Sequence, residues 1–299
     1  MKFLKGLALS LLSFLLFLSL SVFGLALTLN YTILNPDFIV SEVDELDISS
    51  LAREFLSEEI RQEEPYLAEV LANTITDLEP WIRDQTRTSI YSTYDYLLGK
   101  SESLSLVISL EPVKDSLKDN LREAILKSPP PELAGAIPAT VELYINEAYQ
   151  YIDELIPLRF EFNESSLGPE VLAQLEQARQ YIGYFQLGYK LLIGFILLLI
   201  LGIILINRQV RGATRKLGII FTTYGAFEYL GIFIIKNLAG TQLTKLDVPA
   251  QLQTLLPQLL SDFLAPLEIF SICLMVAGVA LIIVSFVYKP RQPSETEAI

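Results

Sequence analysis

Four long apolar runs constrain this chain more than any other feature of its sequence. Each run reaches the roughly 20 residues that an α-helix needs to cross the ~30 Å hydrocarbon core of a bilayer. Backbone groups at that depth must satisfy their own hydrogen bonds, so each run predicts a membrane-spanning helix. The expected spans are residues 6–29, 187–206, 217–235 and 263–288. The fold class that follows is a mainly α membrane protein with four transmembrane helices.

The first run, residues 6–29, has two interpretations. A signal peptide would be cleaved after it, whereas a signal-anchor would be retained as a helix. The run exceeds the roughly 7–15 apolar residues usual in a signal peptide, and no clear small-x-small cleavage site follows it. We therefore favour a retained anchor over cleavage.

Basic residues outside the spans predict the orientation of the chain, because Lys and Arg concentrate in cytoplasmic loops. With four spans, the three main basic clusters fall on one side of the membrane. They are Lys2 and Lys5, then Arg208, Arg211, Arg215 and Lys216, then Lys289 and Arg291. We expect a multi-pass protein of the plasma membrane. Residues 1–5, the loop 207–216 and residues 289–299 would be cytoplasmic, whereas residues 30–184 and 236–262 would lie outside.

The expected outer domain, residues 30–184, is strongly acidic. It carries 11 Lys and Arg against 29 Asp and Glu, a net charge of −18, in a chain with an overall charge of −13. Such a domain will not bind nucleic acid or anionic headgroups through a basic patch. A solvated surface explains this charge. The alternative is a docking surface for a cationic partner or Ca²⁺, although no segment has the spacing of an EF-hand loop.

Hydrophobic periodicity predicts that this domain is mostly helical, with a small two-stranded β element. Spacing of about 3.6 residues indicates helices at 41–60, 64–77, 78–100, 111–128 and 139–155. Alternating apolar residues indicate strands at 103–110 and 157–163, which we expect to pair with each other or across a dimer. A last helix from Pro169 runs unbroken into the second span. It is either a stalk or a rod that transmits movement to the membrane.

The outer loop 236–262 contains a predicted amphipathic helix. From Asp247 onward, apolar residues share one face, as in a helix that lies on a membrane surface. We expect Pro257 to kink this helix.

The residue inventory excludes several kinds of catalysis. The chain has no His, and its only Cys, Cys273, lies in a spanning run. Ser–His and Cys–His pairs, His-ligated zinc and intrachain disulfides are therefore excluded. No P-loop, G-x-S-x-G, H-E-x-x-H or G-x-G-x-x-G pattern is present. We expect a non-enzymatic protein with no catalytic residue, no cofactor and no metal site.

Aromatic residues in the segment 78–100 offer one candidate binding site. An amphipathic helix there would turn Ile82, Thr86, Ile90, Tyr94 and Leu97 to one apolar face. The plain interpretation is that this face is packed in the core. The alternative is a ligand groove lined by Trp81, Tyr91, Tyr94 and Tyr96.

Two acids inside the expected spans form the second candidate site. Charges at this depth are costly and tend to face protein or water. Glu228 and Glu268 both lie in the outer half of the bilayer, where they can share a proton, or one can pair with Lys190. Small and polar residues near them are typical of close helix packing: Tyr224, Gly225 and Gly231 in one span, and Ser271, Gly278 and Ser285 in the other. The acids are either structural or a proton or cation site.

Two segments, "TLNYTILNPDFIV" and "EPWIRDQTRTSIYSTYDYLLGKSESLSLVISLEPVKDSL", resemble bacterial membrane-anchored proteins with a helical extracytoplasmic domain. That resemblance implies no activity and transfers no functional residue. The order of one span, a large outer domain and three spans is similar to ABC-type permeases of cell division and lipoprotein release. "RGATRK" is similar to their cytoplasmic coupling segment, but the loop 207–216 is short for a helix that grips an ATPase.

The sequence predicts a membrane protein whose acidic outer domain binds a partner or senses a condition. Its partners would be membrane lipid and a protein at the outer face or in the membrane, and not nucleic acid. The oligomeric state is left open. The alternative is a small transporter or permease-like subunit that uses Glu228 and Glu268.

Overall fold

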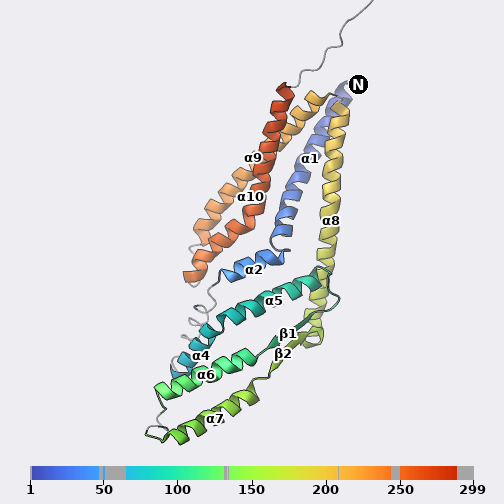
Figure 1. Cartoon of the computed structure of the whole chain (residues 1–299). Coiled ribbons are helices and arrows are strands. Elements are labelled where there is room, and N and C mark those ends of the chain that lie inside the picture. Colours follow the sequence, from blue (N-terminus) through green and yellow to red (C-terminus); the bar gives the residue numbers. More distant parts are fainter. Residues whose placement is uncertain are drawn as a thin grey trace, which may run out of the picture. The chain divides into compact units, whose positions relative to one another are not determined.

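The computed structural model describes residues 2–46, 50, 65–130, 133, 135–207, 209–243 and 250–287. The chain divides into two compact units. We call them the span unit, Met1–Asn35 with Tyr184–Ile299, and the acidic unit, Pro36–Gly183. Within the described ranges the chain is mostly helical, with one two-stranded sheet (Figure 1).

Four helices carry the apolar runs: α1 (Lys2–Tyr31), α8 (Pro169–Asn207), α9 (Val210–Leu243) and α10 (Ala250–Val287). Each contains a stretch long and apolar enough to cross a membrane. The predicted count of four spans is therefore confirmed at the level of length and composition. The unbroken helix predicted from Pro169 into the second span is also confirmed, because α8 has no interruption.

The connections between the spans are shorter than expected. α9 begins at Val210, so most of the expected loop 207–216 is helical. At its other end α9 continues to Leu243, and α10 begins at Ala250. The amphipathic segment predicted as a separate helix is the first part of α10, which passes through Pro257 and Pro266. Membrane helices tolerate such prolines where surrounding groups satisfy the freed carbonyl.

α9 and α10 form the most extensive helix pair of the span unit. Their backbones meet at glycines: a Cβ added to Gly225 would lie 2.5 Å from the carbonyl oxygen of Ser271 and 2.9 Å from the amide nitrogen of Met275. Ser271 and Ser285 are buried, which confirms the predicted polar seam on α10. Gly231 was predicted to lie at a close helix contact, but a Cβ there would meet nothing within 4 Å. It lies outside the close contact.

Tyr224 of α9 joins α1 to this pair. Its side chain is 1% exposed, and its hydroxyl donates a hydrogen bond to the carbonyl of Leu20 at 3.1 Å. Its ring makes edge contacts with Phe17 of α1 and Phe270 of α10. Without a hydrophobic driving force inside lipid, such van der Waals and hydrogen-bond contacts are what hold helices together. Tyr224 is therefore a central packing residue of the span unit.

The helices of the acidic unit share a start signal. They are α2 (Pro36–Asp44), α4 (Pro65–Asp77), α5 (Glu79–Leu97), α6 (Glu111–Lys127) and α7 (Pro138–Leu155). Each has a proline at its first or second residue, where the missing N–H has no helical partner to lose. α5 ends at Leu97, close to the end of the predicted helix 78–100, and Gly99 just beyond it adopts a left-handed φ of 73°. Most of the predicted helix 41–60 lies outside the described residues.

The two predicted strands pair with each other within one chain. β1 (Ser105–Ser109) and β2 (Arg159–Asn163) are antiparallel, with Leu106 opposite Phe162 and Ile108 opposite Phe160. This register puts the apolar residues of both strands on the same face, because side chains alternate along a strand. A short 3₁₀ turn, η2 (Glu164–Ser166), follows β2.

Ion pairs between lysines of α6 and an aspartate of α7 join these two helices. Lys114 is a buried lysine whose Nζ lies 3.2 Å from Oδ1 of Asp153, and Lys118 Nζ lies 2.7 Å from the same oxygen. The hydrogen bonds from Lys118 and Lys114 hold the pKa of the Asp153 carboxyl below its ordinary value. Beside these pairs lies a small apolar cluster of Ile125, Leu133 and Ile145.

Candidate functional site

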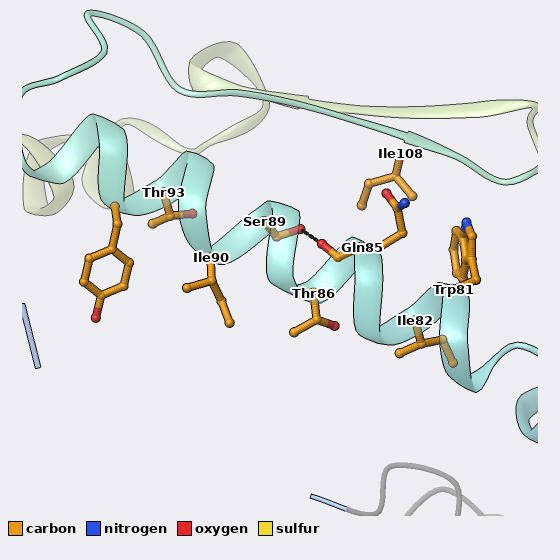
Figure 2. Close-up of a pocket in the computed structure, with 9 residues that line it drawn as sticks. Trp81, Ile82, Gln85, Thr86, Ser89, Ile90, Thr93 and Ile108 are labelled. Carbon is orange, nitrogen blue, oxygen red and sulfur yellow. Dashed lines mark hydrogen bonds between the residues drawn. The ribbon is translucent and has the colours of Figure 1, made fainter. Parts of the chain in front are cut away.

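The acidic unit has an open hollow between α5 and β1. Its volume is about 440 Å³, in the range of small-molecule sites. Figure 2 shows its wall, which is formed by one side of α5 and by Ile108 of β1. The lining residues are Trp81, Ile82, Gln85, Thr86, Ser89, Ile90, Thr93, Tyr94 and Ile108.

The spacing of these residues explains the shape of the site. The α5 residues fall at steps of four in two adjacent rows, which form one long stripe on a helix. The stripe contains apolar, hydroxyl and amide side chains and no charged residue. That absence of charge in the lining is notable in a unit that carries 29 acids against 11 basic residues. Burial raises the pKa of the Tyr94 hydroxyl above its ordinary value.

The apolar surface continues onto the sheet. Ile108 lies directly opposite Phe160 of β2, and Phe160 is 50% exposed. Leu158, just before β2, is also exposed. These exposed apolar and aromatic groups lie next to Ile108, outside the lining of the hollow, and enlarge the apolar surface that a partner could cover.

The structure divides the predicted aromatic groove. Trp81 and Tyr94 line the hollow. Tyr96 is buried, with the guanidinium of Arg179 over its ring at 4.8 Å. Tyr91 turns to α2, where its hydroxyl donates a 2.6 Å hydrogen bond to Asp37. Two of the four predicted aromatics therefore belong to the site.

The apolar face of α5 is not packed in a core as predicted. Ile82, Thr86, Ile90 and Tyr94 were expected to be packed, but they line the open hollow and are only half-buried. Helical periodicity identifies the apolar face of a helix, but the partner that covers that face is decided elsewhere in the chain. In the described part of this unit, the two-stranded sheet supplies one wall and leaves the rest open.

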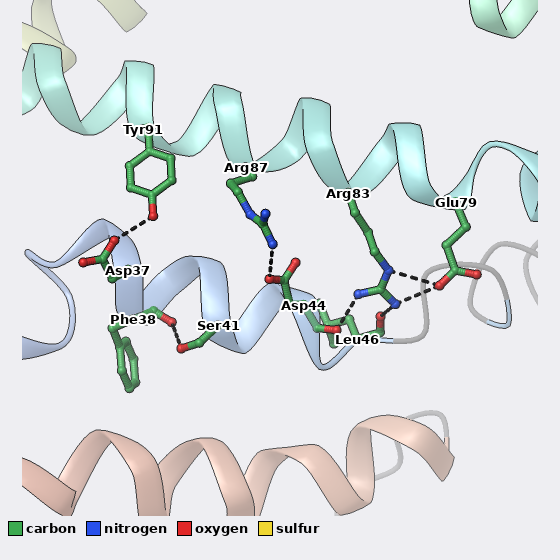
Figure 3. A network of polar contacts seen from close by, with 9 residues as sticks. All are labelled: Asp37, Phe38, Ser41, Asp44, Leu46, Glu79, Arg83, Arg87 and Tyr91. Atoms are coloured by element: carbon green, nitrogen blue, oxygen red, sulfur yellow. Dashed lines mark hydrogen bonds and ion pairs between the residues drawn. The ribbon is translucent and has the colours of Figure 1, made fainter.

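A polar network holds a different stripe of α5 against α2 (Figure 3). Arg83 is central: it donates to the carbonyl oxygens of Asp44 and Leu46 at the end of α2, and to the carboxylate of Glu79 at 2.8 Å. Arg87 forms a 2.7 Å ion pair with the Asp44 carboxylate. A cation that donates hydrogen bonds to the last carbonyls of a helix also interacts favourably with the negative end of the helix dipole. This network orients α5, and with it the wall of the hollow.

We expect Arg83→Gln to destabilise the acidic unit by about 1–3 kcal/mol, because charged hydrogen bonds to two carbonyls are lost. The matched control is Arg87→Gln, whose side chain is 49% exposed and has one partner, Asp44, among the described contacts. Its effect should be clearly smaller. The measurement is thermal unfolding of the full chain followed by the fluorescence of Trp81, the only tryptophan. Equal effects of the two changes would contradict this role of Arg83.

The membrane acids have different partners from those expected. Glu268 forms an ion pair with Lys236 of α9, with Nζ 2.5 Å from Oε2. Glu228 is half-buried and interacts with the Tyr224 hydroxyl one turn earlier. Lys190 is exposed on α8 and has no ion pair among the described residues. Of the two alternatives for these acids, a shared proton or a pair with Lys190, the structure shows neither among the residues it describes, and it pairs Glu268 with Lys236 instead.

Sequence reasoning missed Lys236 because it lies one residue beyond the expected end of the third span. The continuation of α9 carries it alongside α10, where the antiparallel helix presents Glu268. The sequence did show a basic residue directly after the expected span, but Lys236 was assigned to the loop 236–262. A lysine paired with a carboxylate near a helix end is a common way to keep a charge in a membrane. The two roles predicted for Glu228, as a structural acid or as part of a proton or cation site, both stay predictions.

Comparisons of the chain with protein-family models, with curated proteins and with solved structures found no match.

Proposed function

We propose that the chain is a non-enzymatic membrane protein whose acidic unit binds a cationic segment of a protein partner at the α5–β1 hollow. The observation that carries this proposal is an uncharged, partly aromatic hollow within a unit of net charge −18. The four candidate spans anchor the protein, and the basic residues between them favour a location of the acidic unit outside the cell.

The two properties of the site have separate roles. The uncharged lining removes apolar side chains of the partner from water, which is the main source of binding energy. The acidic unit around it attracts positive charge and repels anionic competitors, which raises the association rate and the specificity. A partner segment with alternating or clustered basic and apolar residues satisfies both.

A link to the membrane is supported by chain connectivity. α8 begins in the acidic unit and continues as a candidate span without a break, and α2 follows α1 after a four-residue connection. The acidic unit is therefore covalently joined to two candidate spans, and a partner bound to it is held beside them by non-covalent contacts. We propose that this arrangement anchors the complex and couples its binding to the span unit.

Trp81 provides a direct test, because the only tryptophan of the chain lines the hollow. The full chain in an uncharged detergent is titrated with a synthetic peptide of alternating lysine and leucine. We expect a saturable change in Trp81 emission that weakens as salt is added, since exposed charges are screened beyond about 10 Å at 0.1 M salt. A peptide of alternating glutamate and leucine should bind at least about tenfold more weakly.

Two variants separate binding in the hollow from peptide uptake by the micelle. Ser89→Phe fills the hollow and should abolish the saturable change. Thr88→Phe adds the same ring at the neighbouring exposed position outside the lining and should leave it intact. Equal responses of both variants, or equal affinity for the two peptides, would overturn the proposal.

A further inference from the structure

The span unit contains a second hollow, between the end of α1 and the middle of α10. Its volume is about 370 Å³, and it opens outward from the two helices. The lining residues are Leu27, Tyr31, Pro266, Ile269, Phe270 and Cys273. We propose that this hollow is a binding site for one acyl chain of a membrane phospholipid. This site is independent of the partner site in the acidic unit.

Pro266 lines the hollow from within α10. Its ring replaces the backbone N–H inside α10 and is shorter than the leucine and isoleucine side chains around it. α1 contributes Leu27 and Tyr31 to the same lining. The two helices therefore leave an unfilled volume where larger side chains would otherwise meet.

The chemistry of the lining matches hydrocarbon. Four of the six side chains are purely apolar, and the Tyr31 hydroxyl and the Cys273 thiol are the polar groups among the lining side chains. Both helices are long and apolar enough to span a bilayer, so the medium at this depth is acyl chains. Irregular peptide cannot occupy a lipid-exposed position there, because its backbone groups would have no partners.

Another transmembrane helix fits this hollow poorly. A helix with its side chains is about 10–12 Å across, too wide for a volume of this size. Close helix association also needs small residues at the contact. On α10 those residues, Ser271 and Gly278, already face α9, whereas Ile269 and Phe270 border the hollow. A flexible chain of methylene groups meets both constraints.

Tyr31 indicates a phospholipid as the source of the chain. It belongs to the last turn of α1, at the end of the first candidate span, and its side chain is 55% exposed. Tyrosines at span ends lie at the level of lipid headgroups, where the ring is apolar and the hydroxyl is hydrated. A phospholipid whose headgroup stays at this level can extend one chain past Tyr31 toward Cys273.

Cys273 makes the proposal testable in the unmodified protein, because it is the only thiol and is exposed in the hollow. Delipidated full-length protein in maltoside detergent is labelled with a maleimide while phosphatidylcholine is added. We expect labelling to slow saturably, by about tenfold at a lipid concentration roughly ten times the dissociation constant, because only the empty fraction reacts.

The control places the thiol elsewhere on the same helix. Ile283→Cys in a Cys273→Ser background moves it to an exposed position outside the hollow. Labelling there should change little with added lipid. Ile269→Trp fills the hollow and should remove the lipid dependence at Cys273. Equal slowing at both cysteines, or protection that persists in Ile269→Trp, would overturn the site. Protection by free oleic acid but not by phosphatidylcholine would overturn the assignment to a phospholipid.

Discussion

Replacing Tyr224 by alanine should lower the unfolding free energy of the span unit by about 3–5 kcal/mol, as for buried aromatic residues in other packed cores. The side chain is 1% exposed and contacts rings from α1 and α10. Its removal leaves a cavity at the point where three helices meet, and the lost van der Waals contacts have no replacement. Thermal denaturation of the purified full chain in detergent, followed by far-UV circular dichroism, measures the loss.

Tyr224→Phe is the matched control, because it keeps the ring and removes only the hydroxyl. The hydrogen bond to the Leu20 carbonyl is then lost, which should cost about 1 kcal/mol. If phenylalanine proves as damaging as alanine, the hydroxyl and not the ring packing is the main contribution of Tyr224. If alanine is tolerated, α1 is not held to α9 and α10 in the way the structure describes.

Gly225→Ala should destabilise the span unit by about 1–3 kcal/mol, through the overpacking of two helices that already touch. A single methyl group at this position would lie 2.5 Å from the Ser271 carbonyl oxygen, which is backbone and cannot turn aside. α9 and α10 must therefore separate to accept it. The same denaturation measurement applies, and a loss of close packing should also make the variant more prone to aggregate on heating.

The control for Gly225 is Gly231→Ala in the same helix. A Cβ at Gly231 would meet nothing within 4 Å, and alanine is the better helix former by about 0.5–1 kcal/mol. The two identical substitutions should therefore have opposite signs. Destabilisation of equal size at both positions would show that helix propensity, and not the contact with α10, determines the result.

Local patterns were sufficient for most of the fold. Long apolar runs identified the four candidate spans, and alternation identified β1 and β2. Both signals depend only on neighbours in the sequence, since they reflect burial of one face or of a whole helix. Pro169 likewise marked the start of α8, because the backbone limits of proline are a property of a single residue.

The candidate sites were only partly predictable. The aromatic stripe on α5 was recognised, but its role as an open wall depends on Ile108, which comes from a strand elsewhere in the chain. The membrane acid Glu268 was recognised as well, but its partner is Lys236, because α9 extends further than the apolar run that defined the span. In both cases the sequence identified the residue of the site but not the distant residue that contacts it in the fold.

The sequence by itself determined that this chain has four candidate membrane helices and a mostly helical acidic segment that carries a strand pair. These properties follow from hydrophobicity, charge and period along the chain. Only the tertiary structure decided which apolar faces are filled and which stay open. That choice separates the packed contact at Gly225 from the hollows at Trp81 and Cys273. The physical reason is that burial depends on the shape of the facing surface, which distant residues supply.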